Sequence, residues 1–186
     1  MKTYNVTIEG TSPLLMNRPN QLDISDKSKD VKRENRTPKD IASEKLYVDA
    51  EGKVYLPSTW FRGSIVEAGK KKKRGGTGSA KSNFSGIVGS SVEINPFEIV
   101  LNKPNWKVFS ILAVNPTTRG KNVLHRPQFD KWEVDFEVTF DEDQIEPAVL
   151  KDIFDIAGKF VGVGDWRPAK KGSFGKFQVT SWKEAK

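Results

Sequence analysis

The segment Phe160–Val179 reads FVGVGDWRPAKKGSFGKFQV and lies between two regular apolar patterns. Apolar residues recur at helical spacing from Glu146 to about Phe160, and Gly175–Trp182 has the pattern of a closing strand. Glycine lets a backbone approach a ligand closely because it has no Cβ, while Lys and Arg suit phosphates and Trp166 can stack on bases. We therefore interpret this segment as a ligand-facing loop and not as a merely polar surface loop.

The same two patterns of apolar residues, helical spacing and strand alternation, predict the other helices and strands. Strands are expected at Thr3–Gly10, Ser91–Leu101, Val108–Val114 and Trp132–Phe140, with a hairpin over Tyr47–Leu56 that turns at Asp49–Gly52. A short helix is expected with Thr37 as its cap and Pro38 as its first residue, and a longer one from the cap Ser58 to about Lys70. The stretch NPTTRGKNVLHRPQ after Val114 reads as a polar connector.

This order predicts an α+β fold. With insertions at about 12–40 and 70–86 set aside, the elements run βαββαβ, the ferredoxin-like (RRM-like) arrangement. We expect a single domain over residues 1–186, with a long excursion after the first strand and a glycine-rich C-terminal loop. The tract KKKKRGGTGSAKSNFSG, which begins at Lys70, cannot bury apolar area, so we expect it to be mobile without a ligand.

Composition excludes several kinds of site. The chain has no cysteine and a single histidine, His125, which rules out disulfides, thiolate chemistry, cysteine-based zinc sites and multi-histidine metal sites. The N-terminus lacks the apolar core of a signal peptide, and no window approaches about 18 apolar residues. We expect a cytoplasmic protein with no cofactor, no metal and no membrane contact.

Positive charge is segregated along the chain. Ala68–Phe129 carries eleven Lys or Arg against only Glu93 and Glu98, a net charge of +9 in a chain of net charge +7. A second stretch, Trp166–Lys183, contains no acidic residue. Segregation of this kind favours a polyanionic partner. Nucleic acid is favoured over a membrane surface because no basic amphipathic helix is present.

Motifs for nucleotide binding and catalysis are weak. GGTGSAKS resembles a phosphate-binding loop, but Ala80 replaces the glycine before the lysine and no strand precedes it. His125 is a candidate general base near a scissile phosphate, although a loop histidine without that role is the simpler interpretation. Three aspartates of the first excursion are equally weak candidates for metal binding or RNA cleavage: Asp23, Asp26 and Asp30.

Two segments together carry a family resemblance. LPSTWFRGSIVEAGK, at Leu56–Lys70, resembles the helix entry "proline–small–small–x–x–(basic)–Gly" of the repeat-associated mysterious protein (RAMP) superfamily of CRISPR-associated proteins. GKFVGVGDWRPAKKGSFGKFQV resembles the glycine-rich loop that precedes the last strand in that family. The resemblance is to the backbone-subunit (Cas-seven-like) branch, whose members polymerise along guide RNA.

The resemblance implies a ferredoxin-like palm, a thumb-like excursion and head-to-tail stacking along one RNA strand. The resemblance also places Ser58, Arg62 and Gly63 near the RNA backbone. It implies that the glycine-rich loop is formed by Gly162, Gly164, Gly172 and Gly175. In some relatives an aspartate of the excursion cleaves target RNA. The chain departs from the family in its inserted WRPAKK and its short length, which is consistent with a stand-alone or phage-encoded relative.

We expect a non-catalytic RNA-binding subunit of a CRISPR-effector-like ribonucleoprotein in antiviral defence, a homo-oligomer along the strand with other effector subunits as partners. It would bind single-stranded RNA, or DNA, mainly through the phosphate backbone. The candidate contacts are Ser58, Arg62, Gly63, Lys71, Arg74, Arg119, Lys121, Arg126, Trp166, Arg167, Lys171 and Gly172. The alternatives are a metal-independent endoribonuclease with His125 as its base, and a structural or assembly protein that binds an acidic partner.

Overall fold

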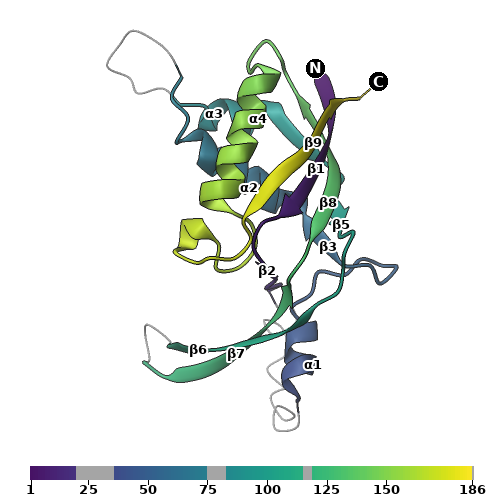
Figure 1. Ribbon diagram of the computed structural model, residues 1–186, viewed down its shortest axis with the longest axis vertical. Coiled ribbons are helices and arrows are strands. Elements are labelled where there is room, and N and C mark those ends of the chain that lie inside the picture. Colours follow the sequence, from purple (N-terminus) through teal and green to yellow (C-terminus); the bar gives the residue numbers. More distant parts are fainter. Residues whose placement is uncertain (20–35, 75–82, 115–118, 186) are drawn as a thin grey trace.

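The computed structural model describes residues 1–19, 36–74, 83–114 and 119–185. Its main sheet has four strands, β1 (Lys2–Gly10), β4 (Val92–Asn95), β8 (Glu133–Phe140) and β9 (Phe177–Glu184), in the order β4-β8-β1-β9. Every neighbouring pair is antiparallel. Helices α2 (Ser58–Gly69) and α4 (Pro147–Ile156) cover one face of the sheet, and α3 (Ser85–Ser91) lies beside α2 (Figure 1). The predicted α+β fold with an antiparallel sheet is confirmed.

A second part of the molecule extends away from this sheet. Strands β6 (Lys107–Val114) and β7 (Lys121–Phe129) form a long hairpin, which we call the arm, and the short helix α1 (Pro38–Ser43) lies beside it (Figure 1). The short strand β2 (Leu14–Leu15) pairs with the base of β7. A separate two-stranded sheet joins β3 (Tyr55–Pro57) to β5 (Glu98–Val100).

The core follows from the alternation in β8. Val134, Phe136, Val138 and Phe140 are buried, whereas the residues between them face the other side of the sheet. Phe136 packs against Phe61 of α2 and Phe154 of α4, with ring centroids 5.1 Å and 6.3 Å apart. These contacts fix both helices on the sheet, because each buried aromatic ring contributes a large apolar area.

The structure corrects four sequence predictions. The stretch read as a polar connector is strand β7, whose ladder with β6 runs from Lys121 to Gln128. Ser58 is not a helix cap: Pro57 precedes the helix and the Ser58 N–H donates to the carbonyl of Phe97 (2.8 Å). The predicted strand Ser91–Leu101 is two strands, because Pro96 interrupts it. The helix predicted to reach Phe160 ends at Ile156 and continues as a π-helical turn, Ala157–Val161.

Other predictions hold. Thr37 caps α1 in a reciprocal arrangement in which Asp40 N–H donates to the Thr37 hydroxyl (3.2 Å) and Thr37 N–H donates to the Asp40 carboxylate (3.0 Å). The turn at Asp49–Gly52 closes with a hydrogen bond from Gly52 N–H to the Asp49 carbonyl (3.2 Å). The predicted mobile tract falls largely on residues 75–82, and Asp23, Asp26 and Asp30 fall within 20–35; both stretches lie outside the described residues.

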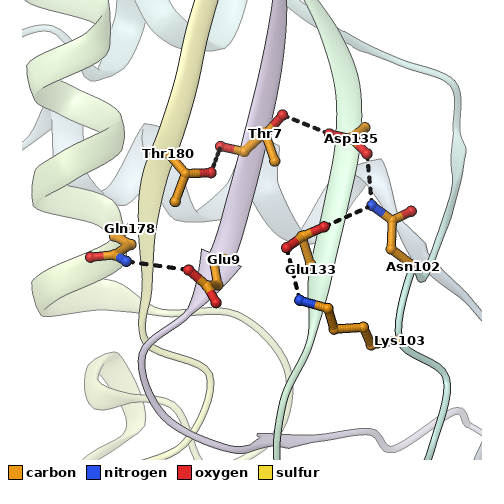
Figure 2. Close-up of polar contacts among 8 residues, drawn as sticks. All are labelled: Thr7, Glu9, Asn102, Lys103, Glu133, Asp135, Gln178 and Thr180. Carbon is orange, nitrogen blue, oxygen red and sulfur yellow. Dashed lines mark hydrogen bonds and ion pairs between the residues drawn. The ribbon is translucent and has the colours of Figure 1, made fainter.

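The face of the main sheet opposite the helices is polar and acidic (Figure 2). Thr7 donates to Asp135 (2.6 Å), and Asn102 bridges Asp135 (2.7 Å) and Glu133 (3.3 Å). Lys103 pairs with Glu133 at 3.0 Å, and this hydrogen bond, with that from Asn102, holds the pKa of Glu133 below its usual range. The sheet therefore offers carboxylates, and no stacking platform of aromatic rings, on its open face.

The loop between α4 and β9 packs on itself. Gly162, Gly164 and Gly175 have positive φ values of 71°, 77° and 68°. A Cβ at Gly175 would lie 1.8 Å from the carbonyl oxygen of Val163, and one at Gly172 would lie 1.7 Å from that of Trp166. Close contacts within the loop therefore explain why glycine is needed at these positions, and no ligand has to be invoked.

One short segment joins the sheet, this loop and the arm. On one edge of the segment, Met16 N–H donates to the Pro127 carbonyl of β7 (3.1 Å). On its other edge, the Leu15 carbonyl accepts from Asp165 N–H (2.9 Å) and the Pro13 carbonyl accepts from Gly175 N–H (2.8 Å). Residues 13–16, which we call the connector strand, are thus hydrogen-bonded on both sides.

Replacing Gly175 by alanine is expected to lower the free energy of unfolding by more than about 2 kcal/mol, because positive φ alone costs a residue with a Cβ about 1–2 kcal/mol and the Val163 carbonyl leaves no room for the new atom. Urea denaturation followed by tryptophan fluorescence measures the change. Gly86→Ala is the matched control, since no described atom lies within 4 Å of its Cβ position. Equal stability of Gly175→Ala and the wild type would contradict the packing argument.

Candidate nucleic-acid interface

The glycine-rich loop and the arm meet through an ion pair and an aromatic cluster. Arg126 Nε of β7 lies 3.2 Å from Asp165 Oδ2, and the two side chains are only 14% and 27% exposed. Phe109 of β6 makes edge contacts with Trp166 and Phe174, with ring centroids 6.1 Å and 5.3 Å apart. Arg126 and Trp166, both candidate nucleic-acid contacts in the sequence, therefore have partners inside the protein.

A groove of about 370 Å³ opens between α2, the glycine-rich loop and residues 17–19. Tyr47 and Trp60 form one aromatic wall, with ring centroids 5.4 Å apart in an edge contact. The Arg18 guanidinium lies 5.9 Å from the centroid of the Tyr47 ring. Burial raises the pKa of the Tyr47 hydroxyl, so this hydroxyl is uncharged at neutral pH and can form hydrogen bonds.

The α2 wall of this groove has two unusual features. Gly63 lies in the helix interior, where glycine costs about 1 kcal/mol relative to alanine, and no described atom lies within 4 Å of its Cβ position. Ser64 is 2% exposed, and its hydroxyl has no hydrogen-bond partner among the described residues. A buried unpaired hydroxyl is costly, and Ser64 is the residue of this wall that carries one.

The opposite wall carries charge. Arg167 lines the groove, and its guanidinium donates one hydrogen bond to the Gly164 carbonyl (3.2 Å). Asp165 also lines it, but its carboxylate is engaged by Arg126. Two exposed lysines, Lys170 and Lys171, follow in the same loop, and neither has an ion pair within the described part of the chain. Arg167 is therefore the cationic residue of this wall, and Lys170 and Lys171 add positive charge further along the same loop.

The other candidate residues do not line this groove. Arg62 donates to the Gly89 carbonyl of α3, and Ser58 is buried. Lys71 and Arg74 are exposed just beyond α2, and Arg119 and Lys121 are exposed near the far end of the arm. His125 lies on the arm with its Nδ1 2.7 Å from the Ser110 hydroxyl.

The structure thus brings together Gly63 and Arg167 and leaves Arg62 and Ser58 out of the groove. Sequence reasoning missed the rest of the α2 wall. Trp60, Gly63, Ser64 and Glu67 follow the i, i+3, i+4, i+7 spacing that places residues on one helix face, and this spacing was the available signal.

Within the described residues, no group of three or more His, Asp or Glu side chains is arranged to hold a metal ion. No helix in the same part of the chain has the length and apolar character needed to cross a membrane.

Replacing Asp165 by asparagine is expected to lower the free energy of unfolding by about 1–3 kcal/mol, because it leaves the partly buried Arg126 guanidinium without a counter-charge. Asp155→Asn is the control, since its ion pair with Lys151 (3.0 Å) is exposed and such helix pairs contribute about 0.3–0.5 kcal/mol. Thermal unfolding of both variants measures the difference. Equal losses would mean that the Arg126–Asp165 pair does not anchor the arm.

No protein-family model matches this sequence, and no curated protein matches it. In three dimensions the chain is similar, over 100% of its length, to a chain in the cryo-EM structure of the Type III-B Cmr-beta bound to cognate target RNA, with a TM-score of 0.64 and 13% sequence identity. It spans 61% of the length of that chain. This is a likeness of fold alone.

Proposed function

We propose that this protein is an RNA-binding subunit of a CRISPR-effector-like ribonucleoprotein, which holds single-stranded RNA mainly through phosphates. The observation that carries the proposal is the groove, with its aromatic wall of Tyr47 and Trp60 and with Arg167 in its lining. The exposed Lys170 and Lys171 follow Arg167 in the same loop. Grooves that combine positive charge with aromatic rings are typical of proteins that bind single strands. The fold similarity to a chain of an RNA-bound Cmr structure supports the same function.

We also assign the main sheet to the ferredoxin-like class and the whole chain to one RAMP-like domain. In chain order its strands are β1, β4, β8 and β9, and their arrangement β9-β1-β8-β4 puts the first and third strands at the centre. Helices between the first and second and between the third and fourth strands complete a βαββαβ unit. A backbone-type subunit of this class would stack head to tail along the strand, in the cytoplasm.

The path of the RNA follows from the distribution of charge. The open face of the sheet is acidic and repels phosphate, so the strand runs on the side of the glycine-rich loop. The arm extends this side, because Phe109 docks it on Trp166. Beyond that contact the arm exposes three apolar side chains beside Arg119 and Lys121, a mixture that suits bases and phosphates together: Leu112, Val114 and Val123.

The affinity for a single-stranded RNA oligonucleotide is expected to fall steeply as salt rises, because phosphate contacts release counterions. Replacing Lys170 and Lys171 together by alanine should reduce the slope of log K against log[salt] by about 1.4, since each single-strand contact contributes about 0.7. Filter binding over a salt series measures both values. The control removes two exposed lysines elsewhere, Lys131 and Lys183, and should leave the slope unchanged. Affinity that barely depends on salt would rule the proposed function out.

Replacing Gly63 by alanine is expected to weaken RNA binding while stabilising the protein by up to about 1 kcal/mol, because alanine favours the helix but its methyl group enters the groove. Gly86→Ala makes the same change in an exposed helix outside the groove lining, and it should leave binding unchanged. Thermal unfolding and filter binding on both variants separate the two effects. Unchanged binding by Gly63→Ala would remove the groove from the RNA path.

A further inference from the structure

We propose that the groove is a nucleobase subsite, which selects a base with adjacent N–H donors, guanine above all, over uracil. This inference rests on the proposed function and adds a preference at one nucleotide to a strand that is held mainly by its phosphates. The volume of about 370 Å³ lies near the lower end of the 300–1,000 Å³ that is common for small-ligand pockets. A single base, and not a longer stretch of the strand, matches that size.

The walls of the groove fit the flat faces of a base. Tyr47 and Trp60 meet edge to face, so the groove is bordered by aromatic surface. Gly63 leaves the helix backbone bare on the same side. Single-stranded RNA is commonly read by stacking unpaired bases on aromatic rings and by hydrogen bonds to their edges. The free space at Gly63 is what a flat ring would need in order to approach α2.

The polar groups on the α2 wall fit a base edge better than a phosphate. Glu67 lines the groove one helical turn beyond Ser64, and its carboxylate accepts hydrogen bonds but cannot donate them. The nearest cation to Glu67 in the described chain is the exposed Lys70, at 3.8 Å on the same helix. A phosphate beside Glu67 would be repelled. The phosphate therefore belongs on the Arg167 side of the groove, and the base on the α2 side.

The choice among bases follows from their donors. Guanine presents adjacent N–H groups at N1 and N2, which a carboxylate can accept together. Uracil presents one N–H between two carbonyl oxygens, which a carboxylate repels. Ser64 adds a buried hydroxyl that can donate to a base carbonyl and that lacks a partner among the described residues. Guanine binding would satisfy both groups, whereas uracil binding would leave the carboxylate unpaired and repelled.

The test measures the affinities of the full chain for four RNA 9-mers that differ at the central position, U9, U4GU4, U4AU4 and U4CU4, by fluorescence anisotropy. We expect U4GU4 to bind about tenfold more tightly than U9, which corresponds to the lower half of the range measured for bidentate base contacts. Equal affinities for all four oligonucleotides, with a steep salt dependence, would overturn the subsite and leave the proposed function standing. Failure to bind any of them would overturn both.

Two variants and one control test which residues cause the preference for guanine over uracil. Glu67→Gln should bring the ratio of the U4GU4 and U9 affinities close to one, because the amide can donate to uracil. Glu93→Gln removes the same charge from an exposed position on β4, and should leave the ratio unchanged. Ser64→Ala should weaken U4GU4 binding without lowering the melting temperature, because the hydroxyl it removes has no partner in the described structure. A guanine preference that survives Glu67→Gln would overturn the inference.

Discussion

The connector strand is the constraint on which the rest of the structure depends. Residues 13–16 give hydrogen bonds to β7 on one edge and accept them from the glycine-rich loop on the other. Neither the arm nor the loop forms a ladder with the main sheet of four strands, and this segment is hydrogen-bonded to both of them. At the same place, the ion pair between the Arg126 and Asp165 side chains joins the arm to the loop. The same segment runs directly into residues 17–19, which form the walls of the groove together with α2 and the loop.

The glycines of the loop and the glycine at position 63 of α2 differ in what surrounds them in the described structure. Gly172 and Gly175 are required by contacts within the loop, because their missing side chains would meet carbonyl oxygens of the same loop. Gly63 has no such contact within the described structure, although it stands in a helix where alanine would be more stable. Gly86 in α3 shares this property, but Gly63 also lines the groove, where a methyl group would take up space.

The sequence predicted those parts of the fold in which burial imposes a period. β1 and β8 alternate because one face is buried, and Thr37 with Pro38 marks a helix start by local chemistry alone. β7 was missed because its first half is exposed on both faces, so no alternation marks it as a strand. The groove was missed for another reason: its walls come from segments that are far apart in the sequence and meet only in the folded chain.

Charge and shape finally divide the surface into sides with different roles. Carboxylates on the open face of the sheet accept hydrogen bonds from Thr7, Asn102 and Lys103, which fixes negative charge there (Figure 2). Lysines of the glycine-rich loop have no such partners in the described chain, and their charge is available to a polyanion. Between these sides, Arg126 is neutralised by Asp165, so the junction that positions the groove adds no net charge to it. In the proposed function, a strand held by its phosphates would lie on the side of the glycine-rich loop. Among the described residues that line the groove, Glu67 is the one carboxylate not paired with Arg126, and a base edge would meet it there.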